Sequence, residues 1–113
     1  MAETIRSAVH TIMRLLAKRD YAGVEGLTGG RSLSARDLEG AVREYGGTIT
    51  LPPPAAYEEL LDVVEMEGTL KRAWSVRMPV WTAEEGRSDL ALDLTVTQAE
   101  GRLVVEVDGL HVP

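Results

Sequence analysis

The chain of 113 residues contains no cysteine and no phenylalanine. The missing cysteine excludes disulfide scaffolds, thiolate zinc sites, iron–sulfur clusters and cysteine nucleophiles. Without phenylalanine, the flexible side chains of Met13, Met66 and Met78 are expected to fill gaps in the core. Basic side chains are also scarce, at 12 against 18 acidic ones. Because the net charge of −6 disfavours binding to a phosphate backbone, we predict no nucleic-acid partner.

Long apolar runs are absent as well. Charged residues and His10 interrupt the first twenty positions, so the sequence predicts no secretory leader. No later stretch approaches the ~18 consecutive apolar residues of a spanning helix. We therefore expect a cytoplasmic protein that has no membrane partner. With 44% apolar and 27% charged residues, the chain is expected to fold as a single domain over residues 1–113.

The apolar residues before the triple proline at positions 52–54 have a helical spacing, which predicts a helical half over residues 1–47. A stripe with the spacing i, i+4, i+7, i+8 and i+11 predicts a helix over residues 3–18, with His10 on its polar face as a surface histidine. Capping and stop residues delimit two shorter helices. These residues are Asp20 and Gly29-Gly30 for the second helix, and Ser34, Asp37 and Gly46 for the third.

In the sheet half, residues 48–113, the apolar period changes to two. Three segments with alternating apolar and polar residues predict antiparallel strands that have one face on a core. They span residues 74–80, 90–96 and 103–107, with turn signals at 84–87 and 99–101. The predicted fold class is α+β, in which two or three N-terminal helices pack on one face of a C-terminal antiparallel meander sheet of about four strands.

The start of the sheet half contains one ambiguous segment and one short candidate strand. Residues 55–67 match either a helix or a strand, and we favour a strand over about 60–67 that pairs with residues 73–82. Residues 48–51 are expected to form at most a short edge strand, because Pro52 stops the strand from extending inward.

Near the C-terminus, Gly109 breaks the alternation of the last strand. Leu103, Val105 and Val107 are odd-numbered, whereas the next apolar residue, Leu110, is even-numbered. Either a bulge at Gly109 shifts the phase and places His111 on the polar side, or the strand ends there.

The polar residues opposite the apolar edge of the strands form the main candidate surface. Carboxylates on neighbouring strands can approach within ~5 Å, where they share a proton or bind a hard cation. His111 beside Asp108 could act as a base with its orienting acid. A solvated charged face is the simpler interpretation, followed by a partner-binding surface and then by a catalytic or metal site.

A second candidate lies in the turn that follows Trp81. There Arg87 could contact an anion, and the indole of Trp81 could stack on its guanidinium. The candidate binding residues of the two surfaces together are Trp81, Glu85, Arg87, Asp89, Asp93, Glu106, Asp108 and His111. We assign no catalytic, cofactor-binding or metal-ligating residue, because the chain has no nucleophile elbow, no dinucleotide fingerprint and no calcium-loop spacing.

Two motifs resemble a small bacterial family of unknown function. They are W-T-x-E-E-G-R-S-D-L at residues 81–90 and D-x-L-H-V at residues 108–112. This resemblance implies a bacterial context and no particular activity. The helix and strand order, together with Lys18-Arg19-Asp20-Tyr21 between the first two helices, resembles the cystatin-like and nuclear-transport-factor-like architecture.

Charge is divided unevenly between the two halves. Residues 1–56 carry 7 basic and 6 acidic side chains, whereas residues 57–113 carry 5 and 12. We therefore favour a non-enzymatic interaction module, of the inhibitor or immunity type, that binds a basic protein partner. A homodimer through the sheet face would be compatible with this function. The alternative is a small-molecule-binding, isomerase-like or hydrolase-like pocket protein of the cystatin-like kind, whose cavity Tyr21, Tyr45 and Trp74 would line.

Overall fold

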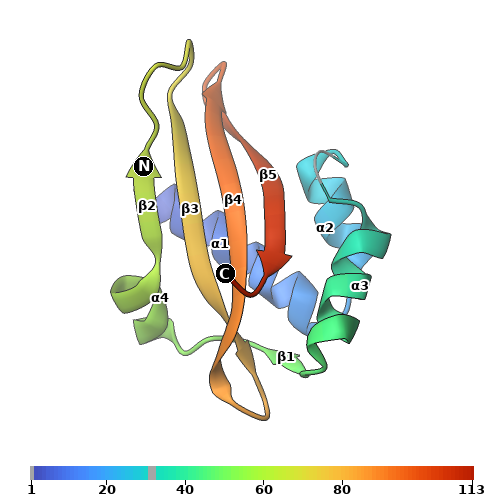
Figure 1. Cartoon of the computed structure of the whole chain (residues 1–113). Helices are drawn as coiled ribbons and strands as arrows, with labels where there is room; N and C mark the ends of the chain where they lie inside the picture. The colour runs from blue at the N-terminus through green and yellow to red at the C-terminus, as the bar shows by residue number, and fades with distance from the viewer. Residues whose placement is uncertain (1, 31–32) are drawn as a thin grey trace.

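The computed structural model describes residues 2–30 and 33–113 and contains four helices and five strands in that part of the chain. The N-terminal half supplies three helices and the C-terminal half most of the sheet, so the predicted α+β class is confirmed (Figure 1). The elements are α1 (Ala2–Ala17), α2 (Tyr21–Thr28), α3 (Ala35–Tyr45), β1 (Ile49–Thr50), α4 (Pro54–Leu60), β2 (Asp62–Glu65), β3 (Ala73–Thr82), β4 (Gly86–Ala99) and β5 (Arg102–His111).

The capping signals of the sequence form the expected contacts. Asp20 accepts a hydrogen bond from the backbone N–H of Gly23, and Ser34 and Asp37 form a reciprocal capping box at the start of α3. Gly29 and Gly46 end α2 and α3 in the left-handed conformation.

All strands pair antiparallel, in the order β1-β3-β4-β5, with β2 also on β3. Strand β2 pairs with β3 as far as Arg77, and β1 pairs with β3 from Trp81 onward. Among the described residues, no strand pairs with the intervening part of β3 on that side, and Pro79, which lacks an N–H group, occupies this gap.

The ambiguous segment before β3 contains both predicted structures in succession. Residues 54–60 form α4, with Pro53 and Pro54 at its start, and residues 62–65 form β2. The favoured strand is therefore confirmed in its middle, and the helical alternative is correct for the first half. The short edge strand is confirmed as β1.

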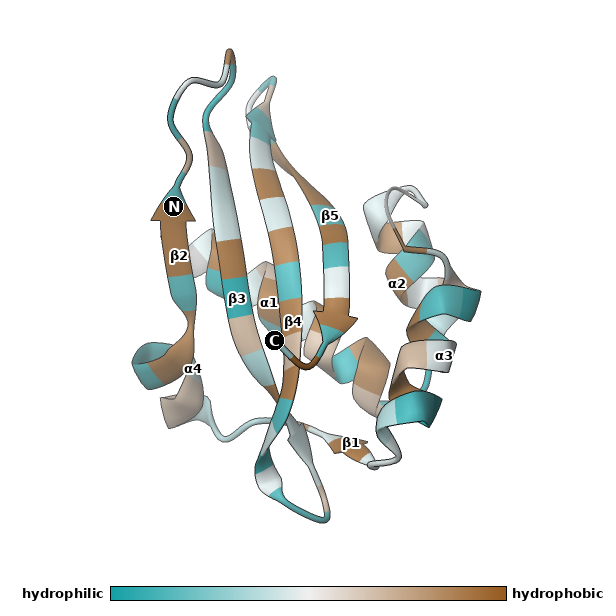
Figure 2. Cartoon of the chain, in the orientation of Figure 1, coloured by the Kyte–Doolittle hydropathy of each residue, from teal (hydrophilic) through white to brown (hydrophobic). Residues whose placement is uncertain are grey.

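The core lies between α1 and one face of the sheet. Figure 1 shows α1 crossing behind the strands, and Figure 2 shows hydrophobic and hydrophilic residues alternating along β3 and β4. The fully buried apolar side chains include Ile5, Val9, Ile12, Met13 and Leu16 of α1, and Val76, Met78, Leu92, Leu94 and Val96 of the sheet.

The expectation for the methionines is correct for two of three. Met13 and Met78 are fully buried, whereas Met66 is 39% exposed. Strand β2 ends at Glu65, and Met66 lies beyond it, where its backbone N–H donates to the carbonyl of Ala73. Because Met66 lies just past the end of a peripheral strand, it is outside the core between α1 and the sheet.

The Leu92→Ala variant tests this core assignment. Leu92 is 1% exposed at the centre of β4, so removal of its side chain is expected to lower the free energy of unfolding by about 2–5 kcal/mol. The control Leu70→Ala makes the same chemical change at a fully exposed loop residue and should alter it by about 0.5 kcal/mol or less. Chemical denaturation measures both, and equal losses would contradict the assignment.

Candidate functional site

The sheet face opposite α1, hereafter the outer sheet face, presents the polar residues of β2, β3, β4 and β5. No helix in the described part of the chain covers it in the view of Figure 1. The residues on it are Asp62 and Val64 of β2, Ser75, Arg77, Pro79 and Trp81 of β3, Arg87, Asp89, Ala91, Asp93 and Thr95 of β4, and Glu106, Asp108 and His111 of β5.

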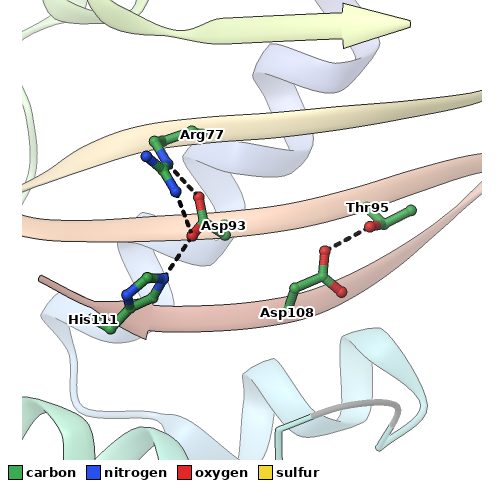
Figure 3. Close-up of polar contacts among 5 residues, drawn as sticks. All are labelled: Arg77, Asp93, Thr95, Asp108 and His111. Atoms are coloured by element: carbon green, nitrogen blue, oxygen red, sulfur yellow. Dashed lines mark hydrogen bonds and ion pairs between the residues drawn. The ribbon is translucent and has the colours of Figure 1, made fainter. Parts of the chain in front are cut away.

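Asp93 lies at the centre of this face and joins three strands. Its Oδ1 accepts a hydrogen bond of 2.6 Å from Nε of Arg77, and its Oδ2 accepts one of 3.1 Å from a terminal guanidinium nitrogen (Figure 3). The same Oδ2 lies 2.8 Å from Nε2 of His111. The carboxylate is therefore held from β3 and β5 at once, in a geometry that favours a planar, bidentate pair.

Burial and hydrogen bonding have opposite effects on the pKa of Asp93. Partial burial of the carboxylate raises its pKa, but the hydrogen bonds from Arg77 and His111 and the positive charge of Arg77 outweigh this effect. The pKa of Asp93 therefore lies below its usual value, and the carboxylate is ionised at neutral pH. The hydrogen bond and charge of Asp93 also raise the pKa of Arg77, with a smaller contribution from Asp62.

A bulge in β5 brings His111 into this cluster. Asp93 pairs with Gly109 and Leu94 with Val107, so Asp108 is the extra residue and the phase of the strand shifts there. Of the two alternatives for this segment, the bulge is the one that forms, at Asp108 next to Gly109, and it places His111 on the outer sheet face. A Cβ atom at position 109 would come within 2.7 Å of the His111 ring, so glycine permits the ring to reach Asp93.

Asp108 does not contact His111 in the way that a base and its orienting acid would. Its Oδ2 instead accepts a hydrogen bond of 2.5 Å from the hydroxyl of Thr95, on the neighbouring strand. The acid that holds His111 is Asp93, and the same carboxylate is already bound to Arg77. Among the described residues, no group of three or more His, Asp or Glu side chains is placed to hold a metal ion.

The residues of the hairpin between β3 and β4 serve mainly to hold it in place. Glu85 accepts a hydrogen bond of 2.6 Å from the Tyr45 hydroxyl, and Glu84 accepts hydrogen bonds from the backbone and the hydroxyl of Thr48. Glu85, a candidate binding residue, therefore anchors the hairpin to the end of α3.

Trp81 and Arg87 are cross-strand neighbours, as the sequence suggested, but the expected stacking is not formed. The cation–π contacts in the described structure are those of Arg6 with Tyr57 and of Arg72 with Trp74. Arg87 is exposed and Trp81 is half-buried, and the two remain paired across the strands just beyond the register shift that follows Pro79.

The three aromatic residues that were expected to line one cavity lie in different places. Tyr21 borders a surface hollow beside α3, and Tyr45 is bound to the hairpin. Trp74 is 5% exposed and pairs with Arg72 near the opposite end of β3. The prediction of one cavity lined by Tyr21, Tyr45 and Trp74 is therefore wrong, because Trp74 lies at the start of β3 and Tyr45 contacts the hairpin at its end.

The sequence patterns did not indicate two features, one on the outer sheet face and one outside it. Asp62 was not a candidate, because the structure of its segment was unresolved between helix and strand. His10 is exposed, as expected, but its Nδ1 also lies 3.1 Å from the hydroxyl of Tyr57. The two positions are 47 residues apart, and no local pattern in the sequence indicates their contact.

The Arg77→Gln variant tests the central cluster. Removal of the guanidinium is expected to raise the pKa of Asp93, because the burial that raises this pKa is then opposed only by the contact with His111. In the native protein, the stability that this carboxylate contributes is present above its unfolded pKa near 3.8 and is lost as the pH falls through its lower folded pKa. The difference in free energy of unfolding between the native protein and the variant should therefore be largest at neutral pH and decrease as the pH falls into the acid range.

Carbon-detected NMR titration of the Asp93 carboxyl measures this pKa directly. Arg43→Gln is the control, because Arg43 pairs with Glu39 on α3, away from the outer sheet face. An Asp93 pKa that is the same in the Arg77 variant as in the control would contradict the bridge.

No helix in the described residues is long and apolar enough to cross a membrane. Searches of the curated proteins and of the solved structures found no match to this chain. The resemblance to cystatin-like and nuclear-transport-factor-like architecture therefore stays a prediction. A family model, described as a domain of unknown function, DUF7668, matches residues 13–113. Because this match spans most of the sequence, the chain belongs to the DUF7668 family.

Proposed function

We propose that this protein is a non-enzymatic interaction module whose outer sheet face binds a cationic segment of a partner protein. An inhibitor or immunity-type role toward a basic effector is the form of this function that we favour. The observation that carries the proposal is the combination of an uncovered sheet face with an excess of carboxylates on it. Such a surface steers a basic partner toward itself and fixes its orientation.

The charges on the outer sheet face are unbalanced toward acid. The face carries five carboxylates and two arginines, which gives a net charge of −3 when His111 is counted as neutral. The charge of Arg77 is already matched by Asp93. On β5, Glu106 and Asp108 form no ion pair with any described residue. The carboxylates of the face are Asp62, Asp89, Asp93, Glu106 and Asp108, and the arginines are Arg77 and Arg87.

The same face has a hollow that suits an apolar anchor. A depression of about 430 Å³ lies next to the Asp93 cluster, with Leu60, Pro79, Ala91 and Val112 among its lining residues. Val112 is 54% exposed, which is unfavourable in water and becomes favourable when a partner covers it. An apolar or aromatic side chain of the partner would occupy this hollow while its cations pair along β5.

A second copy of the same chain is the less favourable occupant. Two outer sheet faces brought together would each contribute a net negative charge, and this repulsion opposes a symmetric dimer. Trp81 lies on this face, so an apparent mass in solution that falls on Trp81→Ala would indicate self-association instead.

Affinity capture with matched charge reversals tests the proposed function. The native chain at low salt is expected to recover a basic protein, and Glu106→Lys should reduce the recovery at least about fivefold because it reverses a charge on the docking face. The control Glu44→Lys reverses an exposed charge on α3 and should leave the recovery unchanged. High salt should release the partner by screening the charges.

The proposal fails if the native chain recovers only itself or an acidic protein. It also fails if both charge reversals reduce the recovery equally, because the carboxylates of the outer sheet face would then have no special role.

A further inference from the structure

A second hollow, separate from the outer sheet face, lies between α1 and the stretch from Pro52 into the first half of α4. It has a volume of about 420 Å³ and is lined by Arg6, Ser7, His10, Pro52, Pro54 and Tyr57. None of these residues belongs to β3, β4 or β5. Its volume falls in the range of sites that hold small molecules, about 300–1,000 Å³.

Two donor groups converge on this hollow from one side of α1. Arg6 and His10 are four residues apart, so successive turns of the helix present them on the same side. The Arg6 guanidinium lies 5.6 Å from the centroid of the Tyr57 ring and donates to the carbonyl of Pro54 at 3.3 Å. Its other contact is with Glu58 at 3.5 Å, and the Glu58 side chain is 72% exposed, so an incoming anion can displace it into solvent.

The hollow is also preorganised. Tyr57 is 5% exposed and forms an edge-on aromatic contact with His10, whose Nδ1 lies 3.1 Å from the tyrosine hydroxyl. Burial raises the pKa of Tyr57 against a lowering by Arg6, so its hydroxyl stays protonated at neutral pH. When this hydroxyl donates to Nδ1, the Nε2–H group of His10 remains as a donor, and it has no partner among the described residues.

The proline walls favour a carboxylate over a phosphate. Phosphate sites usually use several backbone N–H groups, and the consecutive prolines at positions 52–54 supply none. A planar guanidinium beside one imidazole instead matches the two oxygens of a carboxylate. The rings of Pro52, Pro54 and Tyr57 offer an apolar surface to the rest of such a ligand.

We propose that this hollow binds a small carboxylate with an apolar or aromatic body. The carboxylate is held by Arg6 and by Nε2–H of His10, and the body lies against the proline and tyrosine rings. The site does not depend on the proposed partner surface, because the two share no residue.

The test uses benzoate and phenylacetate as probes, with benzamide and phenylacetamide as their uncharged counterparts. Titration of the ¹⁵N-labelled chain is expected to give a Kd of about 1 mM or tighter for a carboxylate, with shift changes at residues 6–10 and at Tyr57. Each amide should bind at least about tenfold more weakly, because it lacks the charge that Arg6 recognises.

Variants assign the binding to the proposed groups. Arg6→Gln should weaken carboxylate binding at least about tenfold, while Arg14→Gln, the same change two turns along α1, should leave it unchanged. Tyr57→Phe keeps the ring and should weaken binding less than Arg6→Gln does. Arg6→Lys keeps the charge and serves as the informative variant should Arg6→Gln fail to fold.

Three results would overturn the proposal. They are no binding of either carboxylate, equal binding of the amides, and equal losses in the Arg6 and Arg14 variants. Glu106→Lys, which tests the outer sheet face, should leave benzoate binding unchanged, so failure of one site can be told from failure of the other.

Discussion

Burial of one sheet face beneath α1 is the constraint on which the rest of the structure depends. The apolar stripe of α1 contacts the alternate side chains of β3, β4 and β5, and these residues form one continuous core. Because side chains alternate across a strand, burial of one set fixes which residues point the other way. A shift of one residue in pairing would exchange the two faces, so the core that holds the fold together also determines the charged surface opposite it.

The bulge at Asp108 modifies this constraint at one point, and the candidate site depends on it. Without an extra residue in β5, Leu110 and His111 would exchange faces. With it, Leu110 is buried and His111 reaches the carboxylate of Asp93. Asp93, on β4, therefore contacts Arg77 of β3 and His111 of β5, and the charged groups at the centre of the polar face are paired with one another (Figure 3).

The sequence predicts those features that local patterns determine. The capping residues Ser34 and Asp37 and the alternation along residues 74–80 and 90–96 are local patterns, and the structure confirms them. The break in alternation near Gly109 is also visible in the sequence, and the structure resolves it as a bulge at Asp108. Contacts between distant residues have no such signal. His10 contacts Tyr57 because the tertiary fold brings α1 next to α4. Tyr45 and Trp74 are apart because one contacts the β3–β4 hairpin and the other lies at the start of β3. The secondary structure of residues 54–65 could not be predicted as one element, because a helix and a strand follow each other there within a few residues.

The molecule thus presents two chemically distinct surfaces that share no residue. The outer sheet face is acidic and open, whereas the hollow beside α1 is lined by Arg6, His10 and rigid apolar rings. Of the two surfaces, the outer sheet face is the one proposed to dock the protein partner. The most direct measurement adds the captured partner to the ¹⁵N-labelled chain and maps the amide shifts. Changes concentrated at Arg77, Asp93 and Glu106 are the predicted result, and changes confined to α1 or α3 would contradict it.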